Sequence, residues 1–384
     1  MGFTIEDMLT IGRDKYNMEI IAGRDGWANS ISWLHVVEDT TLIQNFWGRE
    51  MAVTTGLGFA TEEKQRALVE DLIAHHAAGL VINTGKYIPV VPKEVMNICD
   101  ANDFPLLTVP WEVHLADLMK DFSIRVFLQD GEDQKISTAM IQAITEPEHQ
   151  EHYRDALKPF FDVDGSFQTV LITTDGLDTM DTVERRKLSN QMQVYLEGIS
   201  HNGNFFYYDS AFVLVMNDIE DEDRRSIVEG MVRRAQMRTS KEIPFYVGVG
   251  TKVIDVANLY RSFHRAESAM IRAMKLKKSV VRFDEMGVYR LLYSIPDKKL
   301  LEEMRDEPLR PLLEYDEKHK SNLVETLEMY LNCDGSIKQM AAEMYTHRNT
   351  VIYRVNKIKE MLGTDFSSPQ DRVKYQVAFY IRKM

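Results

Sequence analysis

The chain has 384 residues, of which 44% are hydrophobic, and its formal net charge is −13 at pH 7. This length and apolar content suffice for two or three packed domains. No apolar run approaches the roughly 18 residues of a membrane span. The amino terminus MGFTIEDMLT lacks the pattern of a secretory signal. We therefore expect a cytoplasmic protein. Cys99 and Cys333 lie far apart in different predicted domains, which fits a reducing compartment and excludes a CxxC metal or redox site.

Residues 1–115 alternate short apolar strands with amphipathic helical segments, which is typical of an α/β domain. Thr4 is a candidate cap for a first helix over residues 5–9. Two further helices are predicted over residues 62–76 and 92–100. The predicted strands are residues 18–22, 31–37, 51–54, 79–82 and 105–109.

Polar, glycine-rich segments follow two of these strands. Ligands often bind where the strands of an α/β sheet end, so these segments are candidates for binding a small-molecule effector. The alternative is that their glycines only form turns. Three charged residues could help to bind a polar metabolite, although single charges are usually solvated. The candidate effector-binding residues are Glu38, Arg49, Glu50, Thr54, Thr55, Gly56, Asn83, Thr84 and Gly85.

Residues 116–161 are predicted to form a helical linker, with candidate breaks at Asp130-Gly131 and at Pro147. An amphipathic stripe marks its first half, and helices of this kind between two domains often pair with their copies in a dimer. This stripe is therefore a candidate dimer seam. Its apolar members are Leu115, Leu118, Phe122 and Val126.

His149 and His152 stand three residues apart within the sequence EHQEH, so they could hold a metal ion with help from Glu148 or Glu151. No other set of ligands accompanies them. A solvated helix surface is the favoured interpretation, and we predict neither a metal nor any other cofactor.

Residues 162–295 alternate strands and helices around a central antiparallel hairpin, which suggests a ferredoxin-like sheet. The predicted strands are residues 168–173, 205–208, 212–216, 245–249 and 280–283. The predicted helices are residues 181–199, 222–238 and 256–274.

The remaining residues are predicted to be helical, with a joint over residues 296–320 that Pro308 and Pro311 interrupt, followed by an all-α domain over residues 321–384. A last helix should begin with Pro369 after a Ser368 cap. The supporting helix near the start of this domain has the apolar stripe Leu323, Leu327, Tyr330 and Leu331.

Two short helices joined by a tight turn lie within this domain. Ser336 and Gln339 predict a capping box at the start of the first helix. Thr346 is a candidate cap for the second, which Gly363 should end. The apolar stripe of the first helix is Ile337, Met340, Ala341 and Met344, and that of the second is Val351, Val355, Ile358 and Leu362.

The opposite face of the second helix is basic and rich in side chains that suit DNA. Arg and Asn can make paired hydrogen bonds to guanine and adenine edges, and Tyr, Arg and Lys can reach phosphates. The pair is therefore predicted to be a helix-turn-helix, whose alternative is a helical hairpin with a solvated basic face. The candidate DNA-binding residues are His347, Arg348, Asn349, Thr350, Tyr353, Arg354 and Lys357.

Charge is distributed in a way that agrees with this prediction. Residues 346–384 contain eight Lys and Arg residues against three Asp and Glu residues, a local net charge of +5, so the rest of the chain carries −18. Charge acts over about 10 Å in salt, so the local balance decides. A basic region this small would neutralise few phosphates as a monomer, which favours a homodimer or tetramer.

The segment THRNTVIYRVNKIKEMLG, with LVETLEMYL upstream, resembles the carboxy-terminal DNA-binding domain of the PucR/CdaR family of bacterial transcriptional regulators. The family's HRNT…YR pattern stands here as His347 to Thr350 with Tyr353 and Arg354. A weaker resemblance extends to an amino-terminal PucR-type sensor domain, through REMAVTTG and GLVINTGKY. It also extends to a GGDEF-like middle domain, whose hairpin here reads YYDSAF without the family's glycines.

The resemblance implies a ligand-responsive regulator of a catabolic operon for purine, sugar-acid or amino-acid breakdown. Because members of the family are mostly activators, it implies an activator. Its partners would be double-stranded DNA, a small-molecule effector and RNA polymerase, and it would not be an enzyme. Two alternatives are a nucleotide-binding or cyclase-like enzyme, which Asp209 alone cannot support because two metals need more ligands, and an interaction scaffold that does not bind DNA.

Overall fold

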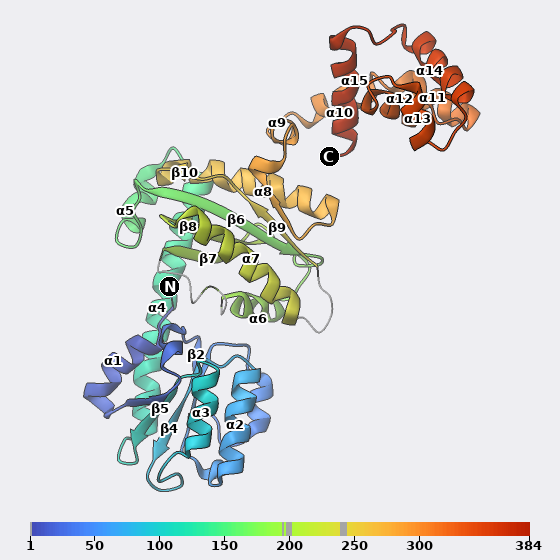
Figure 1. Cartoon of the computed structure of the whole chain (residues 1–384). Helices are drawn as coiled ribbons and strands as arrows, with labels where there is room; N and C mark the ends of the chain where they lie inside the picture. The colour runs from blue at the N-terminus through green and yellow to red at the C-terminus, as the bar shows by residue number, and fades with distance from the viewer. Residues whose placement is uncertain (1, 194–195, 197–201, 239–243) are drawn as a thin grey trace. The chain divides into compact units, whose positions relative to one another are not determined.

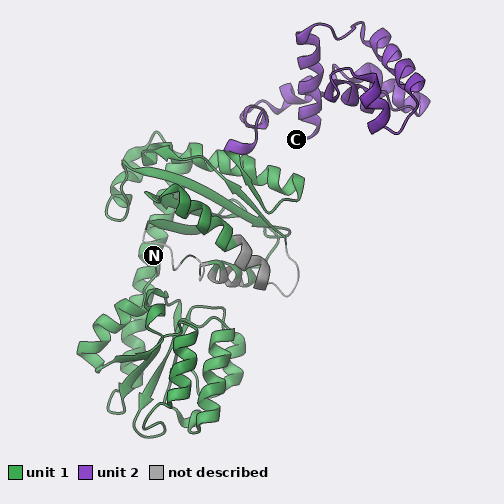
Figure 2. Ribbon diagram, in the orientation of Figure 1, with its two compact units in different colours: residues 1–283 green, residues 284–384 purple. Residues whose placement is uncertain are grey.

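The structure, a computed structural model, describes residues 2–193, 196, 202–238 and 244–384 (Figure 1). The chain divides into two compact units, Met1–Phe283 and Asp284–Met384 (Figure 2). The first unit holds two helix-covered sheets and the second is all-helical, which confirms the predicted fold class. Among the described helices, none has the length and apolar character needed to cross a bilayer.

The first sheet has the strand order β1-β5-β4-β3-β2, in which β2 to β5 are parallel and β1 is antiparallel to β5. Its strands are β1 (Glu19–Ala22), β2 (Trp33–Val36), β3 (Glu50–Thr54), β4 (Gly79–Thr84) and β5 (Leu106–Pro110). The helices of this region are α1 (Ile5–Tyr16), η1 (Arg24–Ala28), η2 (Thr40–Asn45), η3 (Leu57–Phe59), α2 (Glu62–Ala74) and α3 (Lys93–Ala101). All five predicted strands are confirmed to within two residues.

Both faces of this sheet are covered, as a mainly parallel sheet requires. Met51 and Val53 pack with α1 and the start of α4, whereas the intervening Ala52 packs with α2 and α3. The period of two along the strand therefore divides the apolar residues between two cores. Thr4 caps α1 as predicted, and a reciprocal bond from the Thr4 backbone N–H to Asp7 completes a capping box.

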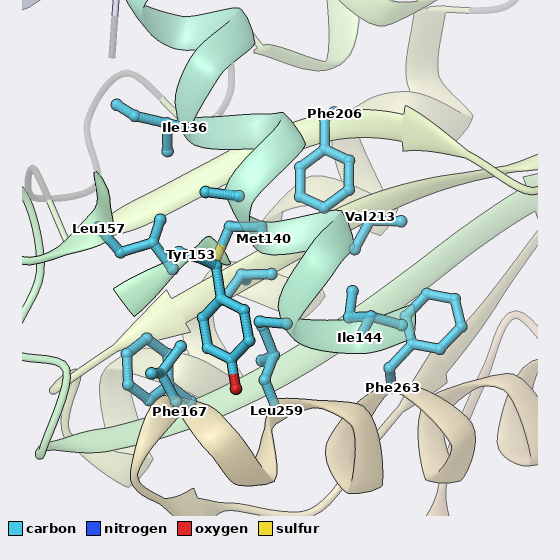
Figure 3. Packing of buried hydrophobic residues seen from close by; sticks show 14 of the residues in the cluster. Ile136, Met140, Ile144, Tyr153, Leu157, Phe167, Phe206, Val213, Leu259 and Phe263 are labelled. Atoms are coloured by element: carbon cyan, nitrogen blue, oxygen red, sulfur yellow. The ribbon is translucent and has the colours of Figure 1, made fainter. Parts of the chain in front are cut away.

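Helix α4 (Leu115–Thr145) is continuous and contributes to two cores. Phe122 is buried against the first sheet, and Met140 is buried in the second core (Figure 3). The predicted break at Asp130-Gly131 is wrong, because a helical glycine costs only about 1 kcal/mol relative to alanine and packing at both ends outweighs that cost. The break before Pro147 is confirmed. The predicted dimer seam is also wrong, because its central residues are buried in the chain's own core.

The second sheet has the order β11-β9-β6-β8-β7, and β10 pairs with β6 outside this path. Strands β9, β6, β8 and β7 are mutually antiparallel neighbours, as the predicted ferredoxin-like pattern requires. The strands are β6 (Ser166–Thr174), β7 (Gly203–Tyr208), β8 (Ala211–Asn217), β9 (Phe245–Val249), β10 (Val253–Ile254) and β11 (Val280–Arg282).

Helices cover both faces of the second sheet. The helices of this region are η4 (Gln150–His152), α5 (Arg154–Leu157), α6 (Thr182–Gln193), α7 (Asp221–Arg238), η5 (Val256–Asn258), α8 (Leu259–Leu276) and η6 (Phe283–Glu285). Phe167 and Val213 face α4 and α8 in the core of Figure 3, whereas Phe212 belongs to the opposite core. The last residues of the helix predicted over 181–199 lie largely outside the described residues.

The β7–β8 hairpin turns through Asp209 and Ser210, whose φ angles are 47° and 61°. A two-residue turn of this kind needs positive φ at both central positions, where only glycine is free of steric cost. We expect Ser210→Gly to raise the free energy of unfolding by about 0.5–1 kcal/mol, after allowing for glycine's greater entropy in the unfolded chain.

Urea unfolding followed by far-ultraviolet circular dichroism would measure this change. Ser226→Gly is the matched control, because Ser226 is exposed on helix α7, where glycine should instead destabilise by some tenths of a kcal/mol. Equal shifts of the two midpoints would show that the turn stores no strain.

The second unit contains the helices α9 (Tyr289–Tyr293), α10 (Lys298–Asp306), α11 (Arg310–His319), α12 (Leu323–Asn332), α13 (Ile337–Glu343), α14 (Arg348–Leu362) and α15 (Pro369–Arg382). Pro311 and Pro369 lie in the first turns of α11 and α15, where the missing N–H costs nothing. The predicted supporting helix is α12, and its Leu327 is fully buried against α14 and α15.

Candidate nucleic-acid interface

Helix α13 is fixed at its start by Ser336, whose hydroxyl accepts a hydrogen bond from the Gln339 backbone N–H at 3.4 Å. The Gln339 side chain donates to Glu343 at 2.8 Å and not back to Ser336, so only half of the predicted capping box forms. Met340 is fully buried on the predicted apolar stripe, beneath α14.

The turn into α14 is built differently from the prediction. Tyr345 adopts a left-handed φ of 48°, which lets the Thr346 N–H bond to the Ala341 carbonyl at 3.0 Å and close α13. His347 is the extended N-cap residue, and its Nδ1 caps α14 by accepting from the Asn349 N–H at 3.3 Å. The predicted Thr346 cap is wrong by one residue. The His347 ring is engaged in holding the helix start.

The predicted apolar stripe anchors α14 on the rest of its domain. Val351, Val355 and Ile358 are buried, and they contact the cores formed with α12, α13 and α15. Gly363 ends the helix with a φ of 63° and donates its N–H to the Lys359 carbonyl. The helix is therefore held by one face and presents the other to solvent.

The solvent face carries most of the predicted DNA-binding side chains. Arg348, Asn349, Thr350 and Tyr353 are exposed, and Arg354 is half-buried at the edge of the face. Across the described residues, no hydrogen bond or ion pair engages the side chains of Arg348, Asn349, Tyr353 or Arg354. These four groups can reorient towards a partner without first breaking a bond within the protein.

Lys357 differs from the others on this face. Its ammonium donates to Glu360 at 3.2 Å and lies 5.9 Å from the ring centroid of Tyr315 in α11. The hydrogen bond to Glu360 raises the pKa of Lys357. A phosphate contact by Lys357 would have to replace the one to Glu360.

Sequence reasoning missed two exposed side chains beside this face. Asn356 lies seven residues after Asn349 and so on the same side of α14, and the helical spacing could have revealed it. Tyr345 is 97% exposed in the turn, compared with 66% for Tyr353. Only the left-handed turn explains why the Tyr345 ring projects outward.

The candidate effector residues do not form one cluster. Thr54–Gly56 and Asn83–Gly85 lie at the carboxyl ends of the neighbouring parallel strands β3 and β4, so they share one edge of the sheet. Arg49 and Glu50 lie at the start of β3, at the opposite edge and roughly 13 Å away at about 3.3 Å per residue.

Each hydrogen-bonding side chain of the candidate set at the carboxyl edge already has a partner within the domain. Glu38 accepts from the Thr55 N–H at 2.6 Å and from its hydroxyl at 2.7 Å, and Thr54 accepts from the Gly56 N–H at 3.0 Å. Asn83 and Thr84 donate to carbonyls of β5 at 2.7 and 3.3 Å. These contacts agree with the alternative that the segments form turns.

The opposite edge is also internally satisfied. Arg49 is buried with a φ of 69°, and its guanidinium donates to the Ser30 hydroxyl. The Glu50 carboxylate accepts from the N–H groups of Trp47 and Gly48 at 2.6 and 2.8 Å, and burial raises its pKa. Both side chains hold the entry to β3 in place.

Three domain families match the chain. Residues 10–126 match the purine catabolism regulatory protein-like family, residues 151–270 a GGDEF-like domain, and residues 323–381 the PucR carboxy-terminal helix-turn-helix domain. Each match overlaps the region in which the sequence predicted a domain of that family.

Curated relatives resemble parts of the chain. The proline-responsive transcriptional activator PutR of Bacillus subtilis is 28% identical over 36% of this chain and 35% of its own length. The DNA-binding transcriptional activator AdeR of the same species is 27% identical over 32% of this chain and 30% of its own length. The purine catabolism regulatory protein of Bacillus subtilis is 25% identical over 27% of this chain and 20% of its own length.

The matched regions thus span about a third or less of the length of these relatives. The three domain matches follow one another along the chain and together cover its first sheet, the second sheet except β11, and its helix-turn-helix. The chain belongs to the PucR family, with an amino-terminal PucR domain, a GGDEF-like middle domain and a PucR-type helix-turn-helix at the carboxy end.

Proposed function

We propose that the protein is a DNA-binding transcriptional regulator in which α14 is the recognition helix. One observation carries this proposal. The side chains of Asn349 and Tyr353 lie on an exposed face and make no hydrogen bond within the described residues, on a helix whose other face is buried. A helix held in this way can enter the major groove with its first turns against base edges.

We further propose that the regulator activates a catabolic operon in response to a small metabolite and acts in the cytoplasm with RNA polymerase. Two of the relatives are named as transcriptional activators, one of them as proline-responsive, and a third is named as a purine catabolism regulatory protein. Amino-acid and purine breakdown are therefore candidate pathways. The small basic region supports a homodimer or tetramer that reads half-sites about one helical turn apart, or a multiple of that spacing.

The middle domain is assigned no reaction. Its hairpin places Asp209 and Ser210 where cyclases of this fold have glycines that let GTP approach the backbone. A fold resemblance alone does not carry an activity.

An electrophoretic mobility shift with genomic fragments from around the protein's own gene tests the proposal. A shift that survives competitor DNA supports a sequence-specific regulator. Absence of any shift, with and without candidate metabolites, would instead favour a scaffold that binds other proteins.

Lys357 should contribute a phosphate contact that is independent of sequence. Lys357→Ala is expected to weaken binding to all duplexes alike and to reduce the slope of log affinity against log salt by about 1. Glu360→Gln is the complementary variant, because it releases Lys357 and removes a negative charge, so it should strengthen binding. Fluorescence anisotropy titrations at several salt concentrations measure the affinity and the salt slope of both variants. If the slopes are unchanged, Lys357 does not contact a phosphate.

A further inference from the structure

The segment between α4 and α5 forms two consecutive tight turns that are anchored to the second core. The His149 N–H bonds to the Glu146 carbonyl and the His152 N–H to the His149 carbonyl, both at 3.0 Å. Tyr153, which is fully buried (Figure 3), donates its hydroxyl to the Pro147 carbonyl at 2.8 Å. The backbone that carries both histidines is therefore fixed at each end.

The turn brings the two imidazole rings together. In a 3₁₀ turn, side chains three residues apart eclipse one another, because the turn has three residues. The rings of His149 and His152 accordingly stack with an interplanar angle of 17° and centroids 5.3 Å apart. Residues three apart are also neighbours on an α-helix, but the 3₁₀ turn η4 aligns them more directly.

Three donor atoms converge at this turn. Glu151 Oε1 lies 3.2 Å from His149 Nδ1 and 3.9 Å from His152 Nε2. One ligand atom from each of the three residues lies within 4.8 Å of the other two. Zinc bonds of about 2.0–2.1 Å in a tetrahedral site place neighbouring ligand atoms roughly 3.4 Å apart. Small rotations of exposed side chains are enough to reach that spacing.

A fourth residue orients one of the rings. Glu146, the last residue before Pro147, lies with Oε2 3.1 Å from His152 Nδ1. A carboxylate on one ring nitrogen fixes the tautomer and leaves the other nitrogen, here Nε2, free to bind a metal. Sequence reasoning did not include Glu146, because it lies outside the EHQEH motif.

The local charge favours a cation. Arg154, the nearest basic residue along the chain, pairs its guanidinium with Asp164 and Asp255 and also donates to the Gln150 side-chain oxygen at 3.3 Å. Glu151 and Glu146 each place a carboxylate oxygen within 3.2 Å of a ring nitrogen of these histidines, so the rings lie among acidic groups.

We propose that His149, Glu151 and His152 form a surface site for a late first-row divalent metal ion such as Zn²⁺, with Glu146 as the residue that orients His152. Two imidazoles and a carboxylate are ligands that Zn²⁺ accepts, and the open fourth position would hold water. Because η4 joins α4 to α5, bound metal would stabilise the connection between the first sheet domain and the second core.

The test is a calorimetric titration of the untagged, chelator-treated full chain with ZnCl₂. One equivalent should bind per chain, and His152→Ala should abolish that isotherm. Glu146→Gln should weaken the affinity by about 10- to 100-fold while leaving the stoichiometry at one, which a purely structural role for Glu146 would not produce.

His264→Ala is the matched control. His264 is likewise exposed and lies 3.4 Å from a glutamate three residues later, Glu267, but it has no second histidine beside it in the described structure. The His264→Ala variant should leave the Zn²⁺ isotherm unchanged. The proposal is overturned if the unaltered protein shows no one-to-one binding, or if His152→Ala and His264→Ala bind Zn²⁺ equally well.

Discussion

Arg348→Ala and Asn349→Ala should each weaken binding to the cognate DNA site by about 1–3 kcal/mol, or roughly 5- to 150-fold, and relax the preference for one base pair. A guanidinium can pair with guanine O6 and N7, and an amide with adenine N6 and N7. Both side chains are exposed and make no hydrogen bond among the described residues, so their removal should leave the fold intact. Anisotropy titrations at fixed salt, with the cognate duplex and its single-base variants, would measure both effects.

The control separates base reading from loss of charge. Arg225 is an exposed arginine on α7, in the other unit of the chain, so Arg225→Ala makes the same change in net charge away from the proposed interface. It should leave affinity and base preference unaltered. If Arg348→Ala behaves like this control, α14 does not read DNA with the face assigned to it.

The helix-turn-helix could be predicted from the sequence because its determinants are local. The stripe of Val351, Val355 and Ile358 records which side of α14 is buried, and Gly363 marks where the helix ends. The cap was misplaced by one residue because nothing in the sequence showed that Tyr345 would adopt a left-handed φ. Such a conformation is uncommon for a residue other than glycine.

The candidate effector residues were chosen by chemistry and by position along the chain, and neither shows which partners the fold supplies. Glu38 bonds to Thr55, which lies 17 residues later, and Asn83 bonds to the carbonyl of Pro110. A polar side chain near a strand end can bind a ligand or complete the local backbone hydrogen bonds. The distinction depends on contacts between distant segments, which an isolated sequence does not contain.

The contact between α8 and β9 is another feature that only the fold reveals. Gly248 on β9 and Gly250 just beyond it face α8, and a Cβ at either position would lie 2.1 Å from a backbone carbonyl oxygen of that helix. Helix α8 presents small, fully buried residues there, including Ser262 and Ala266. The helix and the strand can therefore approach more closely than ordinary side chains allow.

Gly248→Ala should therefore lower the free energy of unfolding by about 3 kcal/mol. The new Cβ would lie 2.1 Å from the Ala266 carbonyl oxygen and 2.3 Å from the Met270 backbone nitrogen. These are backbone atoms, which cannot rotate away as a side chain can. Gly131→Ala on α4 is the matched control, since its Cβ meets nothing within 4 Å and alanine should add up to about 1 kcal/mol of stability there.

Two probes would locate the effect of Gly248→Ala. All four tryptophans lie within residues 27–111, so their fluorescence follows the first sheet domain, whereas far-ultraviolet circular dichroism follows the whole chain. In urea, part of the dichroism signal should be lost at lower denaturant than in the unaltered protein, before the main fluorescence change. Coincident, unshifted transitions would mean that α8 does not lie on β9 as closely as the two glycines require.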